Sequence, residues 1–320
     1  MLEGYHAFDA ANVTRVAPRL ATDEELTRFH TPEYVQMVKI LSKGNMPNLP
    51  IRRYGFGAGD NPVFKGMDKV SRLKSGGGLV GAERLLADEC DVAFNFSGGL
   101  HHAMPSQASG FCIYNDIAVT IAWLLTQGQR VAYVDIDAHH GDGVQAAFES
   151  TDQVLTISIH QDGHTLFPGT GFVEETGRGK GEGTCVNVPL RPYTDDETYL
   201  WAFGEIVLPM VRRFAPDVLV TQLGVDTHYG DPLTSMGLTT SGHEALFKAF
   251  AALTPGKWFA CGGGGYNIDV VPRSWILAFG VMSGQRFADA LPDTYREQYG
   301  GEWLRDHATP DLPPGARDRA

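Results

Sequence analysis

Residues 134–145 read Val-Asp-Ile-Asp-Ala-His-His-Gly-Asp-Gly-Val-Gln, and the fold of the whole chain is best derived outward from this stretch. It completes an apolar run, 130–136, that shows no alternation of polar and apolar residues. Such a run is typical of a strand covered on both faces. Aspartates and histidines follow it directly. Because ligands bind at the carboxyl ends of strands in open α/β sheets, the stretch predicts a buried strand that delivers polar side chains to a functional edge.

Four other short runs rich in β-branched and aromatic residues have the same character: 91–96, 154–160, 217–223 and 257–261. Stretches of helical character lie between and after them, at 115–126, 143–149, 195–214, 241–253 and 271–284. This alternation predicts an α/β fold with a mostly parallel sheet and helices on both sides. No repeat or low-complexity linker divides the 320 residues. We therefore expect one domain over 1–309 and a disordered, Pro- and charge-rich tail over 310–320.

The composition excludes several classes of protein. With 26 Lys and Arg against 38 Asp and Glu, the net charge is −12, so the chain has no excess of cations for binding a nucleic acid. No apolar run approaches the length of about 20 residues that spans a bilayer, and no signal pattern is present at the start. The four cysteines are scattered without a CxxC pair, which indicates a reducing compartment. We expect a cytoplasmic protein without membrane contact; the oligomeric state is not predicted.

Polar residues also follow the other predicted strands. His101 and His102 follow the run 91–96, Asp226 follows 217–223, and Tyr266 follows 257–261 after four consecutive glycines. The carboxyl ends of parallel strands share one edge of the sheet, so we expect these side chains to converge with those of 135–142.

Asp137 and His139 lie two residues apart, so in extended backbone their side chains project to the same side. With Asp226 they form a set of three oxygen and nitrogen ligands that leaves room for a water molecule, as in an open catalytic metal site. Each of these residues alone could instead cap backbone donors in a strand-end turn. Their joint pattern favours the metal site.

The His101-His102 pair could supply ligands, bases or merely polar loop residues. Asp135 and Asp142 remain after metal binding, and a carboxylate that accepts from one ring nitrogen fixes the tautomer of an imidazole. We therefore pair His101 with Asp135 and His102 with Asp142. The phenol of Tyr266 could donate to a developing oxyanion. Gly-rich runs also cradle phosphates, but this one lacks both the GxGxxG spacing and the P-loop ending.

Seven spaced motifs run through the chain from about Thr22 onward: SGGLHHA (97–103), SGFCIYND (109–116), VDIDAHHGDGVQ (134–145), SIH (158–160), FPGTG (167–171), LGVDTHYGDPL (223–233) and GGGGYN (262–267). In this order they resemble the motifs of the zinc-dependent histone deacetylase family, in particular its bacterial acetoin-utilisation-type deacetylases. The resemblance implies an arginase/deacetylase-like single domain with a mostly parallel, eight-stranded sheet flanked by helices. It also implies removal of acetyl groups from acetyl-lysine.

The resemblance further implies roles for individual residues. Asp137, His139 and Asp226 would hold Zn²⁺, or Fe²⁺ as in some members. His102 would act as general base and then general acid with His101 as its electrostatic partner, and Tyr266 would polarise the acetyl carbonyl. The substrate would be bound by a rim aspartate and tunnel residues, namely Asp60, Gly110, Phe111, Phe167 and Gly264. Structural K⁺ or Na⁺ would be held at two sites, the first by Asp135, Asp137, His139, Ser158 and Ile159 and the second by Phe148, Thr151 and Val154.

The match has one departure and leaves alternatives open. Met1–Tyr5 resembles the middle of the family's first helix, so we expect the chain to be N-terminally truncated and to lack the family's first strand. Related enzymes act on acetylated proteins, on acetylated polyamines and on other acylamines. A dimanganese ureohydrolase shares the fold but carries DAHxD, whereas the last aspartate here, Asp142, comes one residue later. The remaining alternative is an inactive module that binds acyl-lysine without turnover.

Overall fold

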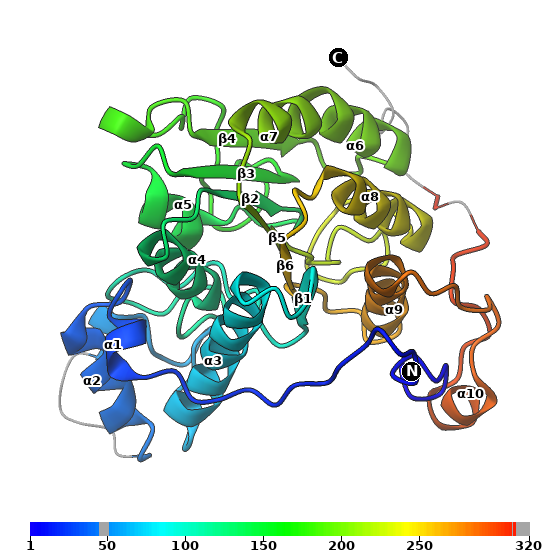
Figure 1. The fold of residues 1–320 in the computed structure, drawn as a ribbon, viewed down its shortest axis with the longest axis horizontal. Helices are drawn as coiled ribbons and strands as arrows, with labels where there is room; N and C mark the ends of the chain where they lie inside the picture. The colour runs from blue at the N-terminus through cyan, green and yellow to red at the C-terminus, as the bar shows by residue number, and fades with distance from the viewer. Residues whose placement is uncertain (45–50, 309, 312–320) are drawn as a thin grey trace.

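The computed structural model describes residues 1–44, 51–308 and 310–311, and its centre is a six-stranded sheet in which every neighbouring pair is parallel (Figure 1). The strands are β1 (Val92–Asn95), β2 (Val131–Asp135), β3 (Val154–Gln161), β4 (Cys185–Leu190), β5 (Val218–Gln222) and β6 (Trp258–Cys261). Their order is β1-β6-β5-β2-β3-β4. In the register of the ladder, Asp135 lies level with Ser158 of β3 and with Gln222 of β5.

Helices cover both faces of the sheet (Figure 1). One layer consists of α3 (Met67–Leu86), α4 (Asp116–Thr126) and α5 (Asp142–Phe148). The other consists of α6 (Asp196–Ala202), a π-helical turn (Phe203–Val207), α7 (Leu208–Phe214), α8 (Thr240–Leu253) and α9 (Val270–Ser283). Successive side chains of a strand point to opposite faces, so each strand contributes to two cores. In β2, Val131 and Tyr133 pack with the first layer, whereas Ala132 and Val134 pack with the second.

Short elements complete the described chain. They are α1 (Asp23–Leu26), α2 (Pro32–Leu41), a 3₁₀ turn (Ile51–Tyr54), a second 3₁₀ turn (Gly179–Gly181) and α10 (Asp293–Tyr299). The start of α2 follows from its sequence, because Thr31 accepts from the backbone of Tyr34 and proline occupies the first turn. A third hydrophobic cluster joins α1 and α2 to the molecule through side chains that include Tyr34, Phe56 and Tyr114. Among the described residues, no helix combines the length and apolar character needed to cross a bilayer.

The predicted fold class, a parallel α/β sheet flanked by helices, is confirmed. All five predicted strands and five predicted helical stretches are present, the stretch 195–214 being interrupted by the π-helical turn. The strand β4 was not predicted. It contains Pro189, and a residue without a backbone N–H is tolerated there because β4 lies at the edge of the sheet. The family resemblance implied eight strands, but the described residues form six. The described segments before Val92 and after Cys261 form no ladder with the sheet. Residues 309 and 312–320, which include most of the predicted tail, lie outside the described residues.

Asp306 fastens the C-terminal segment to the body of the molecule. Its carboxylate accepts hydrogen bonds from Nε2 of His228 at 2.8 Å, from Arg273 at 2.9 Å and from the backbone N–H of Thr240 at 2.9 Å. Burial alone would raise the pKa of Asp306, but the hydrogen bonds from His228 and Thr240 hold it well below its usual value. The ionised carboxylate therefore stabilises the folded chain.

We predict that Asp306→Asn lowers the free energy of unfolding by about 1.5–3 kcal/mol at pH 7, the range for hydrogen bonds to a charged group. A carboxyl group whose pKa is lowered by folding stabilises the protein above its unfolded pKa and loses this contribution as the pH falls through the folded value. Denaturant unfolding should thus show a difference between the two proteins that shrinks below about pH 4. Asp293→Asn, at an exposed aspartate, is the control. A difference that is independent of pH would contradict the assignment.

Candidate active site

The candidate site lies at the carboxyl edge of the sheet, between β2 and β5. The chain leaves β2 through α5 toward β3 on one side, whereas it leaves β5 through α8 toward β6 on the other side. This reversal is the topological switch point at which open α/β sheets bind ligands. Asp137 and His139 follow β2, and Asp226 follows β5, so the three side chains meet across the switch point.

These three residues form a compact group of metal-ligand type. One potential ligand atom from each lies within 4.8 Å of the others, and all three residues are buried. Nδ1 of His139 lies 3.0 Å from Oδ1 of Asp137 and 2.9 Å from Oδ2 of Asp226. Among the residues that the structure describes, this is the only group of three or more His, Cys, Asp or Glu side chains that could hold a metal ion.

The electrostatics of the group fit a cation. Burial and the charge of Asp137 raise the pKa of Asp226 to about 7, because two carboxylates face each other with little water. The carboxylates of Asp137 and Asp226 in turn outweigh burial and raise the pKa of His139 to about 11. Oxygen and nitrogen donors that carry this concentration of negative charge are suited to a divalent metal, and three protein ligands leave a position open for water or substrate.

Neighbouring donors hold the carboxylates in place. Oδ2 of Asp137 accepts from Nε2 of Gln222 and from the backbone N–H of Gly264, both at 2.7 Å. Oδ1 of Asp226 accepts from the backbone N–H of Ala138 at 2.7 Å. A Cβ at position 264 would lie 2.3 Å from Oδ2 of Asp226, so only glycine permits this approach. Sequence reasoning missed Gln222; its one signal is a polar residue at the end of an otherwise apolar strand.

Both histidine–aspartate pairs expected from the sequence are present. Nδ1 of His101 donates to Asp135 at 2.7 Å, and Nδ1 of His102 donates to Asp142 at 2.7 Å. Burial lowers the pKa of His101, but the charges of Asp135 and Asp137 outweigh it and raise the pKa to about 9. Burial and the neighbouring charge of His101 lower the pKa of His102 to about 4. At neutral pH the pair therefore consists of one cationic and one neutral imidazole.

Hydrogen bonds to residues at the start of α4 hold the loop that carries these histidines. The buried carboxylate of Asp116 accepts from the backbone N–H groups of Gly99 and Leu100. The side-chain amide of Asn115 donates to the carbonyls of His101 and Ala103, both at 3.1 Å. Asn115 and Asp116 end the SGFCIYND motif but had no predicted role. Nothing local in the sequence indicates that they reach back to the histidine loop.

Tyr266 approaches the site from the loop after β6. Its backbone N–H donates to Oδ2 of Asp231 at 2.7 Å, and its ring lies 5.8 Å from that of Phe111 in a T-shaped contact. Burial and the charges of Asp137 and Asp226 raise the pKa of Tyr266 above its usual range, so the phenol keeps its proton. Asp231 is a further residue that sequence reasoning missed.

Two aromatic side chains stand at the mouth of the site. Phe111 is 52% exposed and Phe167 is 44% exposed, although both are large and apolar. The ring centroid of Phe167 lies 5.0 Å from that of His102. Between them, a Cβ at Gly110 would meet His102 at 2.4 Å, so the backbone passes directly against the imidazole. This arrangement brings Gly110, Phe111 and Phe167 to the His102–Tyr266 cluster.

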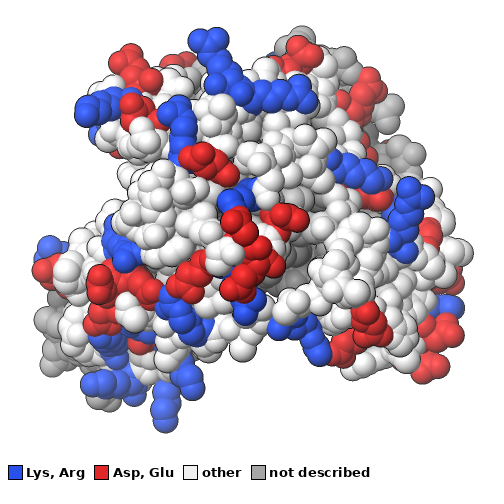
Figure 2. All heavy atoms as spheres, in the orientation of Figure 1, with Lys and Arg blue, Asp and Glu red and all other residues white. Residues whose placement is uncertain are grey.

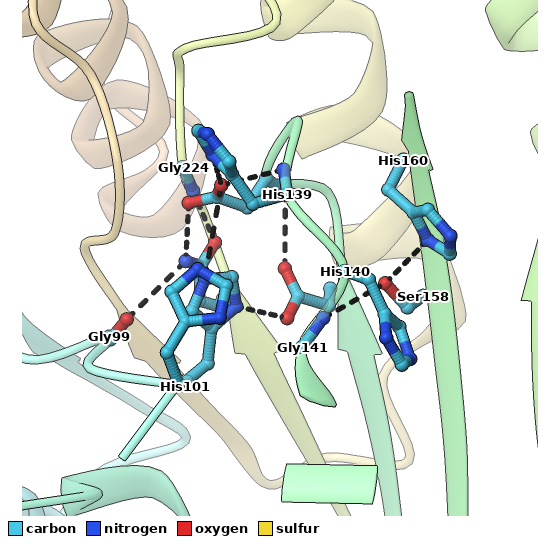
Figure 3. A network of polar contacts seen from close by, with 12 residues as sticks. Gly99, His101, His139, His140, Gly141, Ser158, His160 and Gly224 are labelled. Atoms are coloured by element: carbon cyan, nitrogen blue, oxygen red, sulfur yellow. Dashed lines mark hydrogen bonds and ion pairs between the residues drawn. The ribbon is translucent and has the colours of Figure 1, made fainter. Parts of the chain in front are cut away.

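The remaining predicted residues lie farther out. Asp60 is an exposed residue of the loop after the 3₁₀ turn 51–54. Ser158, at the carboxyl half of β3, contacts Nδ1 of His160 at 2.9 Å, and the carbonyl of Ile159 accepts from Tyr199 at 3.0 Å. Figure 3 shows Ser158 and His160 beside the main cluster. The structure does not bring the second predicted cation group to this cluster, since Phe148, Thr151 and Val154 lie around the start of β3.

Comparisons with known proteins agree with this geometry. The histone deacetylase domain family matches residues 1–282. The acetoin utilization protein AcuC of Bacillus subtilis (strain 168) is 43% identical over 290 residues, which cover 89% of this chain and 74% of that protein. AcuC of Staphylococcus xylosus is 41% identical over 310 residues, covering 95% and 79%. The crystal structure of an HDAC homologue from Aquifex aeolicus superimposes with a TM-score of 0.87 at 33% identity, covering 98% of this chain and 91% of that one. An HDAC homologue complexed with SAHA matches equally well.

We predict that Gln222→Leu weakens the binding of a divalent metal ion at this group, with Zn²⁺ as the probe, about 10- to 100-fold, because residues that orient metal ligands contribute on this scale. The substitution removes the amide that fixes Asp137 and leaves the three ligands in place. Competition with a chromogenic chelator measures the affinity. Gln153→Leu is the matched control, because Gln153 is exposed and its side-chain amide donates to the neighbouring Asp152. Equal affinity of the Gln222 variant and the control would contradict this role.

Proposed function

The chain belongs to the histone deacetylase family, and we propose that it is a metal-dependent amidohydrolase that removes acetyl groups from acetyl-lysine in proteins. One observation carries the proposal: the ring of His102, which is paired with Asp142, lies 5.9 Å from that of His139 in the Asp137–His139–Asp226 group. Tyr266, whose pKa is raised by burial and by the charges of Asp137 and Asp226, comes from the neighbouring loop after β6. A metal site, a base and an oxyanion donor are the parts that hydrolysis of an unactivated amide needs.

Asp137, His139 and Asp226 would hold Zn²⁺, or Fe²⁺ in its place. When bound, the metal would lower the pKa of a water molecule and polarise the acetyl carbonyl as a Lewis acid. The chain's own residues then have two tasks. They hold the amide carbonyl against the site, and they move protons from the attacking water to the leaving amine.

His102 carries the protons. Its Nδ1–H is committed to Asp142, which leaves Nε2 as the basic nitrogen. The pKa of about 4 keeps this imidazole neutral at pH 7, so it can accept the proton of the attacking water. It then returns a proton to the lysine nitrogen as the C–N bond breaks, and the products are acetate and the lysine amine. His101, held protonated by Asp135 and Asp137, supplies a fixed positive charge next to it.

Tyr266 stabilises the oxyanion. Its raised pKa keeps the hydroxyl protonated, so the phenol donates a hydrogen bond where negative charge develops. Asp231 fixes the backbone from which this side chain projects. Gly110, Phe111, Phe167 and Gly264 form the acyl-lysine tunnel, in which the two exposed rings pack on the alkyl stem of the substrate. Asp60 holds the substrate backbone at the rim.

Monovalent cations complete the proposal. K⁺ or Na⁺ would bind near the active site between Asp135, Asp137, His139, Ser158 and Ile159. A second site would use mainly carbonyl groups of Phe148, Thr151 and Val154. A cation beside Asp135 would offset the buried negative charge that the metal group concentrates there.

The position of Asp142 argues against a dimanganese ureohydrolase. Its carboxylate is bonded to His102 and does not join the metal group, and the described residues contain no second cluster of metal ligands. Two catalytic Mn²⁺ per chain in the active enzyme would overturn the deacetylase proposal. An inactive acyl-lysine module is disfavoured because every proposed proton carrier is present. We also propose that the protein acts in the cytoplasm, and that its substrates are proteins rather than small amines.

We predict that the Zn²⁺-loaded protein hydrolyses a fluorogenic acetyl-lysine peptide, and that Tyr266→Phe lowers kcat on the order of 100-fold or more, as loss of an oxyanion donor does. A hydroxamate chelator should abolish the activity. Tyr299→Phe, at an exposed tyrosine of α10, is the control for loss of a phenol elsewhere. Full activity of the Tyr266 variant, or activity that resists the chelator, would refute the mechanism.

Acetylated polyamines assayed in parallel identify the substrate class. We expect the higher kcat/KM with the peptide. A higher kcat/KM with an acetylated polyamine would keep the chemistry and replace the substrate.

A further inference from the structure

A pocket of about 360 Å³ lies within the loop that follows α2, and its lining includes Arg52, Gly57, Gly59, Asp60 and Asn61. We call it the rim pocket. A Cβ at Gly57 or at Gly59 would meet no atom within 4 Å, so this wall is open to an incoming group. The volume is at the lower end of the range for ligand sites and is large enough for one amino-acid residue with its backbone.

The rim pocket adjoins the mouth of the active site. The carbonyl of Tyr54 accepts from the backbone N–H of Ala108 at 2.9 Å. A Cβ at Gly55 would lie 1.9 Å from the carbonyl oxygen of Ala108, so the two loops are in direct backbone contact. Two residues after Ala108, Gly110 passes against His102, and Phe111 stands exposed at the mouth. A peptide whose acetyl-lysine enters the tunnel would therefore run across this loop.

Arg52 and Asp60 offer opposite charges to such a peptide. Both are exposed, and neither side chain has an ion-pair or hydrogen-bond partner elsewhere in the described chain. The amide oxygen of Asn61, a buried residue, likewise finds no donor among the described residues. The pocket thus presents acceptors for the N–H groups of a peptide backbone and one guanidinium, which binds carboxylates bidentately.

The net charge of the whole protein does not favour an anionic substrate. The net charge is −12, and Figure 2 shows Asp and Glu side chains gathered near the middle of the face in view. The long-range field therefore favours cationic partners. A preference for an anionic group at the mouth must come from a direct contact, and Arg52 is the cation on the lining of the rim pocket.

We propose that the rim pocket is a subsite for the residue next to the acetyl-lysine, and that Arg52 makes this subsite select an acidic side chain. The proposal rests on the deacetylase function proposed above and deepens it. The preferred substrates are acetylated proteins with Asp or Glu beside the modified lysine. Arg52 acts on substrate binding, so the selectivity resides in KM.

The test uses acetyl-lysine peptides that differ only in the flanking residue, which is Glu, Gln or Lys on each side in turn. We expect kcat/KM to fall in the order Glu, Gln, Lys on at least one side, with about a three- to tenfold span, as for a solvent-accessible ion pair of good geometry. Arg52→Glu should reverse the order, and Arg52→Gln should flatten it. Arg53→Glu changes the net charge equally one residue away but does not line the pocket, so it should keep the wild-type order.

The outcomes separate the two proposals. If the wild-type enzyme hydrolyses all the peptides equally well, the subsite is refuted and the deacetylase function stands. If Arg53→Glu shifts the order as much as Arg52→Glu does, general surface charge explains the preference and the subsite is again refuted. If no peptide is hydrolysed, the function itself fails and the subsite fails with it. A reversal confined to Arg52→Glu, on one side of the acetyl-lysine, establishes the subsite and its direction.

Discussion

The close approach of two buried carboxylates, Asp137 and Asp226, is the constraint on which the rest of the site depends. Like charges in a region of low water content repel each other unless a cation and several donors compensate for them. The structure supplies the donors from three different segments: Gln222 of β5, the backbone of Ala138 after β2 and the backbone of Gly264 after β6. Each donor fixes the end of a strand relative to its neighbours. The buried carboxylates thus set the geometry of the edge at which all the reactive side chains meet.

Shared hydrogen-bond partners connect these two carboxylates to the histidine pair. Asp135 accepts from His101, from the phenol of Tyr133 and from the backbone of Asp137, so it joins the histidine loop to the metal group. Burial and the charge of His101 together lower the pKa of His102, which keeps the second imidazole neutral. The carboxylates of Asp135 and Asp137 hold the positive charge on His101, and so they act on His102 through it. A change at Asp135 would alter the loop, the metal group and the protonation of His102 together.

Much of this could be predicted from the sequence, for a physical reason. Short, mostly apolar runs without alternation, such as 130–136, indicate strands that are covered on both faces, and the rule that polar strand ends converge located the group of Asp137, His139 and Asp226. Residues that act on the site through other residues were not predicted. Gln222 is an ordinary polar side chain until its neighbour in the sheet is known, and the tolerance of Pro189 in β4 depends on the place of that strand at the edge of the sheet. The count of eight strands came from the family resemblance alone, and the described residues form six.

Burial divides the site into two regions that obey different physics. Around Asp137 the side chains are buried, and Oδ2 of Asp137 accepts two hydrogen bonds, so small displacements are costly. Arg52 and Asp60 are exposed, and their side chains have no partner among the described residues, so each contact that they would make with a substrate is weak and can be exchanged with little effect on stability. Selectivity among acylated partners is therefore expected to vary at the rim while the buried network stays constant. The reaction would thus depend on buried groups that also hold the fold together. The choice of substrate would depend on exposed groups that contribute little to the stability of the fold.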